Sequence, residues 1–311
     1  MIIDAHIHLY RSREHGLQAK EGYEIWEYGA KADVRFSAYS GDLGDALKAI
    51  DEAGASRAVV VNLCSPSEFL PRAIAELPGG LDEAQRDEAV REIHGSMGEM
   101  LRASNIWVCD VAKEHPQLVP FIGVDPSTLG VEEAEAHVRE MVDLHGARGV
   151  KVHPVAQRFH MHDERMLPIW RTCVELDLPV IAHSGPARGD DQYAEPRAFT
   201  DVLRAFPRLR LVLAHMGGGA WRQLPEVAQA HPNAYFDVCE IIEWTGAPNA
   251  PSDRQLAQLI LDVGPERVMM GSDFPWYDID HTAKRVMELP LLSSEQKEAI
   301  LGDNAVRILN I

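Results

Sequence analysis

The stretch from residue 179 to residue 218, PVIAHSGPARGDDQYAEPRAFTDVLRAFPRLRLVLAHMGG, decides the fold of this chain. It begins with a short apolar run, 179–185, and ends with a second one, 209–218, and each run closes on a histidine and glycine. Between them, residues 195–207 carry apolar side chains at helical spacing. Apolar runs that alternate with amphipathic helices indicate parallel strands joined by helical crossovers.

The same unit recurs along the whole chain. Strands are expected at 2–8, 57–63, 118–124, 147–154, 179–185, 209–218, 233–240 and 267–275. Helices are expected at 42–54, about 82–114, 131–146, 164–177, 195–207, 220–232, 253–264, 280–289 and 293–309. Eight uninterrupted strand-then-helix units predict an α/β fold, a (β/α)8 TIM barrel that fills residues 1–311 as a single domain. An open doubly wound sheet is the alternative, but no GxGxxG follows the first strand to support its nucleotide-binding form.

Two segments are longer than a simple crossover requires. Residues 10–41 follow the first expected strand, and residues 64–114 follow the second. Long connections in a compact domain are usually functional. We therefore expect them to form inserted lid segments or an oligomer surface over the mouth of the barrel.

Charge and composition limit the classes of partner. The chain has 48 acidic and 30 basic residues, which gives a formal net charge of -18. Nucleic acids and anionic membranes both reward a basic surface, so neither is an expected partner. Four cysteines without a CxxC pair, and no apparent signal peptide, predict a cytoplasmic protein. We expect a small-molecule substrate and a homo-oligomer, namely a dimer.

Titratable side chains gather where the expected strands end. They are His6 and His8, Lys151 and His153, His183, His215, Glu240, and Asp273. The carboxyl ends of barrel strands meet at one face, so these side chains are expected to converge there. Strand alternation puts His6 and His8 on one face, and it predicts that His215 shares a face with Leu211 and Leu213. Three imidazoles and a carboxylate suit a divalent ion such as zinc, with one position left for water.

Several of these motifs resemble the amidohydrolase superfamily. "DAHIH" (4–8) resembles its first-strand signature, "IAHSG" (181–185) and "LAHMGG" (213–218) its fifth and sixth strand ends, and "GSDFPW" (271–276) its eighth-strand aspartate motif. "AILGDNAVRILNI" (299–311) is similar to the closing helix of the amidohydrolase-related branch. That branch includes aminocarboxymuconate semialdehyde decarboxylase, resorcylate-type decarboxylases and lactonases, all of them metal-dependent TIM barrels. The resemblance extends over residues 2–311.

The resemblance implies roles for individual residues. His6, His8, His183 and Asp273 would bind one divalent metal, zinc first, with Mn²⁺ or Fe²⁺ as alternatives. Asp273 and His215 would be the catalytic residues, with Asp273 transferring a proton and His215 polarising the substrate or transferring one.

Lys151 allows two interpretations. A lysine on this strand is carboxylated in the two-metal members and bridges both ions, whereas an unmodified Lys151 would hold a substrate carboxylate. We favour one metal and an unmodified lysine. His153 and Arg188 are further candidates for substrate binding. Four aromatic side chains are candidates for an apolar wall: Trp26, Tyr28, Trp244 and Trp276.

Two reactions share this set of residues. The first expectation is a metal-dependent hydrolase that cleaves an amide, ester or lactone bond of a small, carboxylated substrate through a metal-activated water. The alternative is a metal-dependent, non-oxidative decarboxylase of a small aromatic or unsaturated carboxylic acid. A metal-binding barrel without catalysis is a third possibility, and it is disfavoured because both Asp273 and His215 are present.

Overall fold

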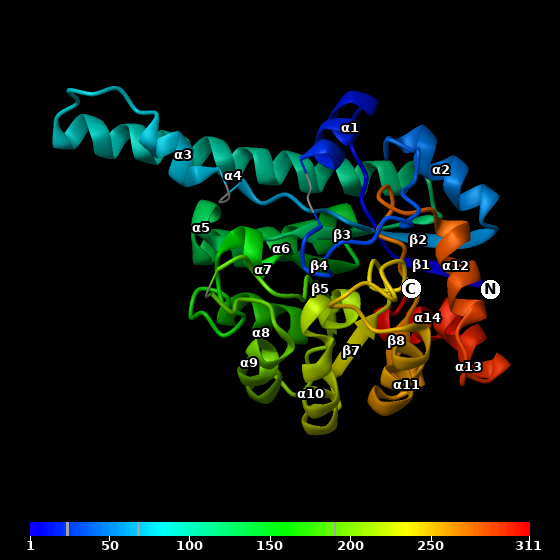
Figure 1. Cartoon of the computed structure of the whole chain (residues 1–311). Helices are drawn as coiled ribbons and strands as arrows, with labels where there is room; N and C mark the ends of the chain where they lie inside the picture. The colour runs from blue at the N-terminus through cyan, green and yellow to red at the C-terminus, as the bar shows by residue number, and fades with distance from the viewer. Residues whose placement is uncertain (23–24, 67–68, 190) are drawn as a thin grey trace.

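The computed structural model describes residues 1–22, 25–66, 69–189 and 191–311 and shows one sheet of eight parallel strands in the order β1 to β8 (Figure 1). The strands are β1 Ile2–Ile7, β2 Ala55–Val61, β3 Leu118–Gly123, β4 Gly149–Val152, β5 Val180–Ala182, β6 Leu211–Leu213, β7 Ala234–Asp237 and β8 Val268–Met269. This confirms the predicted TIM barrel. Strands β4 to β8 are shorter than the apolar runs suggested, because those runs continue into turns that carry polar side chains.

Backbone hydrogen bonds beyond the end of β8 nearly close the barrel. The His8 amide donates to the Phe274 carbonyl at 2.7 Å, and the Asp273 amide donates to the His6 carbonyl at 2.9 Å. The first and last candidate motifs of the sequence are therefore neighbours along this seam.

The helices surround the sheet. They are α1 Arg13–Glu21, α2 Leu43–Glu52, α3 Leu70–Ala75, α4 Glu83–Glu114, α5 Pro126–Leu129, α6 Val131–His145, α7 Pro154–Gln157, α8 Leu167–Glu175, α9 Thr200–Ala205, α10 Leu224–Ala230, α11 Asp253–Val263, α12 Ile279–Glu288, α13 Ser294–Glu298 and α14 Asn304–Leu309. Three expected helices are not α-helical throughout. A 3-10 turn, Pro196–Phe199, precedes α9, and a 3-10 segment, Ala214–Gln223, precedes α10. A π-helical turn, Ala299–Asp303, separates α13 from α14.

Alternate strand residues build two separate cores. The larger lies between the sheet and the outer helices, and the smaller fills the barrel interior. The interior set comprises Ile3, Ala5, Val59, Val61, Val119, Phe121, Ile181, Val212, Ala214 and Met269. Three residues of α14, namely Ala305, Ile308 and Leu309, pack on this set. Helix α14 therefore closes one end of the barrel, and polar side chains occupy the other.

An irregularity in β1 turns its histidines inward. The register between β1 and β2 shifts between Asp4 and Ile7, and Ile7 packs in the outer core. His6 and His8 are both buried and share the opposite face, as strand alternation predicted. Bulges of this kind are common beside active sites because they redirect side chains.

The prediction that His215 shares a strand face with Leu211 and Leu213 was wrong. Leu211 and Leu213 belong to the outer core, so strict alternation would have sent His215 outward with them. Instead β6 ends at Leu213, and residues 215–218 adopt positive φ angles of 62°, 46°, 80° and 53°. Gly217 and Gly218 accept such angles at little cost. This left-handed turn brings His215 back to the centre of the barrel.

Helix α4 is the long crossover expected at 82–114. The Asp82 side chain accepts from the Gln85 amide in a capping box, and the helix runs 32 residues, about 48 Å at 1.5 Å per residue. Together with α3 it projects well beyond the barrel in Figure 1. None of the described helices, α4 included, has the length and apolar character needed to cross a membrane.

Candidate active site

Three side chains converge at the barrel seam. His8 Nε2 lies 3.1 Å from Asp273 Oδ1, and His6 Nε2 lies 3.7 Å from the same oxygen. All three residues are buried, and their ligand atoms lie within 4.8 Å of one another. Asp273 reaches this point from a left-handed backbone with φ 62°.

Two further carboxylates hold this group in place. Asp237, on β7, accepts from His6 Nδ1 at 3.1 Å through one oxygen and from the His215 amide at 2.8 Å through the other. Asp4 accepts from the amides of His6 and Ser272, both at 3.0 Å. The bond to Asp237 fixes the proton of His6 on Nδ1 and leaves Nε2 as a donor atom for a cation.

Gly271 makes room for the first histidine. A Cβ at this position would lie 2.8 Å from the Cβ of His6 and 3.0 Å from the Cβ of Cys239. Real side chains do not approach so closely, so any residue larger than glycine would displace the strands that carry the site. The glycine of "GSDFPW" is thus a steric requirement.

A second group lies beside the first. His215 Nδ1 is 3.0 Å from Cys239 Sγ, and the ligand atoms of His215, Glu240 and Asp273 lie within 4.8 Å of one another. Neither Cys239 nor Asp237 is among the candidate residues predicted from the sequence. The signal was present, because both occupy a buried strand run, "FDVCE", that also ends in Glu240.

The His183 ring is a neighbour of the His215 ring. Its ring centroid is 4.9 Å from that of His215, and it stacks on His153 at 3.9 Å with an interplanar angle of 10°. His183 is outside the tight groups of ligand atoms formed by the described residues. His153 Nδ1 accepts from the Ala156 amide at 3.2 Å, which leaves Nε2–H free to donate.

Electrostatics favour a neutral set of imidazoles beside an ionised carboxylate. Burial and the nearby cations lower the pKa values of His6 and His183 well below their usual range, and they lower that of His153 to about 3. Burial opposes ionisation of Asp273, but the hydrogen bond from His8 and the electrostatic interactions with the nearby histidine rings outweigh it, so its pKa is depressed. Neutral imidazoles and a carboxylate are the donors that Zn²⁺ and Mn²⁺ accept, so this buried group fits a divalent metal.

Lys151 is a buried neighbour of His6. Its Nζ is 3.1 Å from His6 Nε2, it is 2% exposed, and burial lowers its pKa. A metal held by His6 Nε2 would have to displace this contact. Lys151, like Asp273 and His215, is not among the residues that line the pocket described next.

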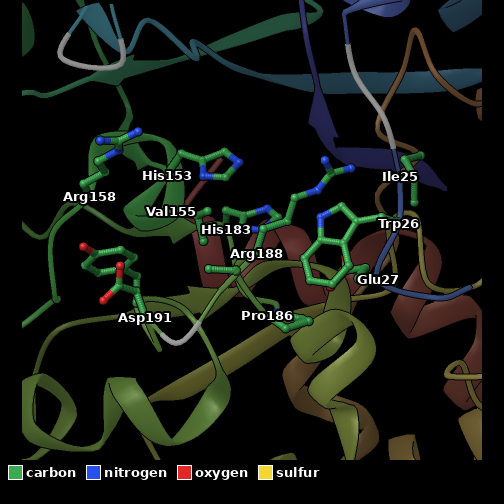
Figure 2. Close-up of a pocket in the computed structure, with 12 residues that line it drawn as sticks. Ile25, Trp26, Glu27, His153, Val155, Arg158, His183, Pro186, Arg188 and Asp191 are labelled. Carbon is green, nitrogen blue, oxygen red and sulfur yellow. The ribbon is translucent and has the colours of Figure 1, made fainter. Parts of the chain in front are cut away.

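A pocket of about 550 Å³ is lined by one of the candidate ligands, His183 (Figure 2). It is lined by Ile25, Trp26, Glu27, His153, Val155, Arg158, His183, Pro186, Ala187, Arg188, Asp191 and Tyr193. The segment 10–41 therefore contributes to the wall, as expected of a lid, whereas no described residue of 64–114 does. Arg188 lies in this wall, with its guanidinium carbon 5.7 Å from the ring centroid of Trp26.

Only one of the four aromatic candidates lines the pocket. Trp26 does, whereas Tyr28 and Trp244 stack on each other at 5.5 Å in the core. Trp276 packs its ring edge-on against His8, with centroids 5.3 Å apart. The expected apolar wall is therefore mostly structural.

Glu27, in the pocket wall, and Glu240, in the second group, are neighbouring acidic side chains. Glu27 accepts from the Gly219 amide at 3.1 Å, and burial raises its pKa to about 7. Burial and the adjacent Glu27 raise the pKa of Glu240 well above its usual range. Glu27 comes from the lid, so this pair connects the lid to the barrel centre.

Solved structures with the same fold include several enzymes. An uncharacterized TIM-barrel protein, Bb4693 from Bordetella bronchiseptica, superimposes with a TM-score of 0.70 at 23% identity, over 99% of this chain and 98% of that one. 5-Carboxyvanillate decarboxylase from Sphingomonas paucimobilis gives 0.67 at 14% identity, over 100% and 99%. A dihydroxybenzoic acid decarboxylase from Polaromonas sp. JS666, solved with manganese and 2-nitroresorcinol, gives 0.66 at 15%, over 99% and 96%.

The sequence itself identifies the family. No curated protein matches the chain in a sequence search. The family model described as Amidohydrolase (Amidohydro_2) matches residues 3–311, which include every candidate ligand and the whole barrel. The chain belongs to this amidohydrolase family.

Proposed function

We propose that the protein is a metal-dependent, non-oxidative decarboxylase of a small aromatic or unsaturated carboxylic acid. The observation that carries this proposal is a cation-bearing pocket lined by His183, whose ring neighbours that of His215 in the buried His/Asp group that fits a divalent metal. The similar structures named as decarboxylases support it, and they favour this reaction over the hydrolysis that was the first expectation from the sequence.

We assign one divalent metal to His6, His8, His183 and Asp273. The donor set suits Mn²⁺ as well as Zn²⁺, and one similar decarboxylase was solved with manganese. When bound, such an ion supplies Lewis-acid stabilisation of negative charge on substrate oxygen.

The residues of this chain would orient the acid. His153 presents a donor N–H to the pocket from a ring that stacks on His183, and Arg188 adds a positive charge beside Trp26. A carboxylate held here by His153 and Arg188 would have its carbon skeleton against the Trp26 indole.

The reaction breaks the bond between carbon and the carboxylate and replaces it with a bond to hydrogen. The electron pair of the broken bond stays on carbon and takes up one proton as CO₂ leaves. Asp273 and His215 present a carboxylate oxygen and an imidazole nitrogen within 4.8 Å of each other. We assign the proton transfer to this pair, of which Asp273 is also a proposed ligand.

The two reactions can be separated in one assay. Mn²⁺-loaded enzyme is incubated with 2,6-dihydroxybenzoate, 5-carboxyvanillate and a panel of esters and lactones in H₂¹⁸O. The proposal predicts released CO₂ from at least one acid, a product with hydrogen in place of the carboxyl group, and loss of the activity with EDTA. Incorporation of ¹⁸O into cleaved esters or lactones, with no CO₂ from any acid, would show a hydrolase instead.

A further inference from the structure

Arg158 is a cation on the pocket wall that the reaction proposed above does not use. It is exposed, it lines the pocket, and its side chain makes no hydrogen bond or ion pair with the residues that the structure describes. The nearby Arg165, by contrast, is held by Asp163 with Nη2 at 2.7 Å from Oδ2. A guanidinium that stands without a partner in a binding pocket is available to an anionic ligand.

Arg158 has a left-handed backbone conformation, which is uncommon for a residue with a side chain. It ends helix α7 in a left-handed conformation, with φ 53° and ψ 51°, where glycine or asparagine is the usual choice. The turn is closed by a bond from the Phe159 amide to the Pro154 carbonyl at 3.1 Å. A bulky residue costs about 1 kcal/mol or more in this region, so the presence of arginine here, in a pocket wall, is consistent with use of its side chain.

The two arginines lie at opposite ends of the pocket. In Figure 2, Arg188 and Trp26 occupy one end, Arg158 lies beyond the His153 ring at the other, and His183 lies between them. Asp191 also lines this wall but forms no ion pair with Arg158. The volume of about 550 Å³ belongs to the range of pockets that hold ligands of drug size.

We propose that Arg158 binds a second carboxylate of the substrate, so that the pocket selects dicarboxylates over monocarboxylates. One carboxylate would lie at His153 and Arg188, as proposed above, and the other would pair with the Arg158 guanidinium at the opposite end of the pocket. The identity of the first carboxylate as the reacting group rests on the decarboxylase proposal, but the preference for two anionic groups does not.

Binding of inert ligands tests this preference. Isothermal titration with isophthalate and with benzoate, which differ by one carboxylate, is carried out on the Mn²⁺-loaded protein and on protein treated with EDTA. Four proteins are compared, namely wild type, Arg158→Gln, Arg158→Lys and Arg171→Gln. Arg171 is an exposed arginine of α8 outside the pocket, so its variant is the matched control.

The expected result is at least tenfold tighter binding of isophthalate than of benzoate to wild type and to Arg171→Gln. The ratio should fall to within twofold of unity in Arg158→Gln, and Arg158→Lys should restore part of it. Equal affinity in wild type, a preference that survives in Arg158→Gln, or no binding of isophthalate at millimolar concentration would each overturn the proposal. If no acid releases CO₂ but the preference is present, the decarboxylase assignment fails and the dicarboxylate site stands.

Discussion

Asp273 is the residue on which the proposed metal centre depends most. It is the carboxylate toward which His6 Nε2 and His8 Nε2 converge, and its pKa is held low despite burial. Asp273→Asn keeps the shape but removes the charge, so we expect at least tenfold weaker metal retention and loss of more than 99% of turnover. Elemental analysis after dialysis measures the first effect.

The matched control is Asp278→Asn, a nearby carboxylate that pairs with Arg35 at 3.2 Å and lies outside the site. It should retain metal and activity. Full metal content in Asp273→Asn would remove this carboxylate from the ligand set.

Gly271 provides a steric test of the same centre. Gly271→Ala would press a methyl group against His6 and Cys239, so we expect reduced metal content and a lowered melting temperature. Gly79→Ala is the control, because nothing lies within 4 Å of a Cβ at that position and its backbone needs no positive φ. If both variants behave like wild type, the close packing at Gly271 is not required for the site.

At the scale of elements, a buried amide fixes the long helix α4 to the barrel. Asn105 accepts from Asn62 Nδ2 at 2.7 Å and from the Gly123 amide at 2.9 Å, and its own Nδ2 lies 2.8 Å from the Gly123 carbonyl. Asn105→Ala would leave these buried partners unsatisfied, so we expect a loss of about 2–3 kcal/mol in unfolding free energy. Chemical denaturation measures it, and the neighbouring Ser104→Ala, which removes a single bond to Asn62, should cost under about 1 kcal/mol.

The sequence predicted the elements better than the orientation of their ends. The eight strands were recognisable because parallel strands buried on both faces are continuous apolar runs. The site begins where those runs stop being strands, and there alternation no longer applies. His215 and Asp273 both have positive φ, and the inward turn of His215 depends on a left-handed segment that the pattern of apolar residues does not encode.

The sequence also did not reveal which residues hydrogen-bond to the candidate ligands. Asp237 orients His6 from 231 positions away, and Lys151 reaches the same ring from another strand. Hydrogen bonds of this kind follow from the tertiary arrangement, so spacing alone could place His6 and His8 but not the residues that surround the His6 ring.

At the scale of the whole molecule, buried histidines couple stability to pH. The pKa of His153 is about 3 when folded, so as the pH falls below about 6.5 the unfolded chain gains a proton that the folded chain does not. Its contribution therefore lowers the unfolding free energy between about pH 6.5 and pH 3. Asp4 and Glu27, with pKa values near 7, act in the opposite direction, so the test is a difference between variants.

His153→Asn keeps an acceptor for the Ala156 amide but cannot titrate. In metal-free protein, wild type should lose about 1–2 kcal/mol more unfolding free energy than this variant between pH 7.5 and pH 5. Denaturant titrations at both pH values provide the measurement. Identical pH dependence in the two proteins would show that His153 is not held neutral.

The proposed function requires that His6, His8, His183 and Asp273 hold one metal ion. Anomalous diffraction from crystals grown with Mn²⁺ measures this directly. We predict a single peak within about 2.5 Å of the imidazole nitrogens of His6, His8 and His183 and a carboxylate oxygen of Asp273, with Lys151 unmodified. The absence of a peak there, or two peaks bridged by a carboxylated Lys151, would contradict the one-metal site.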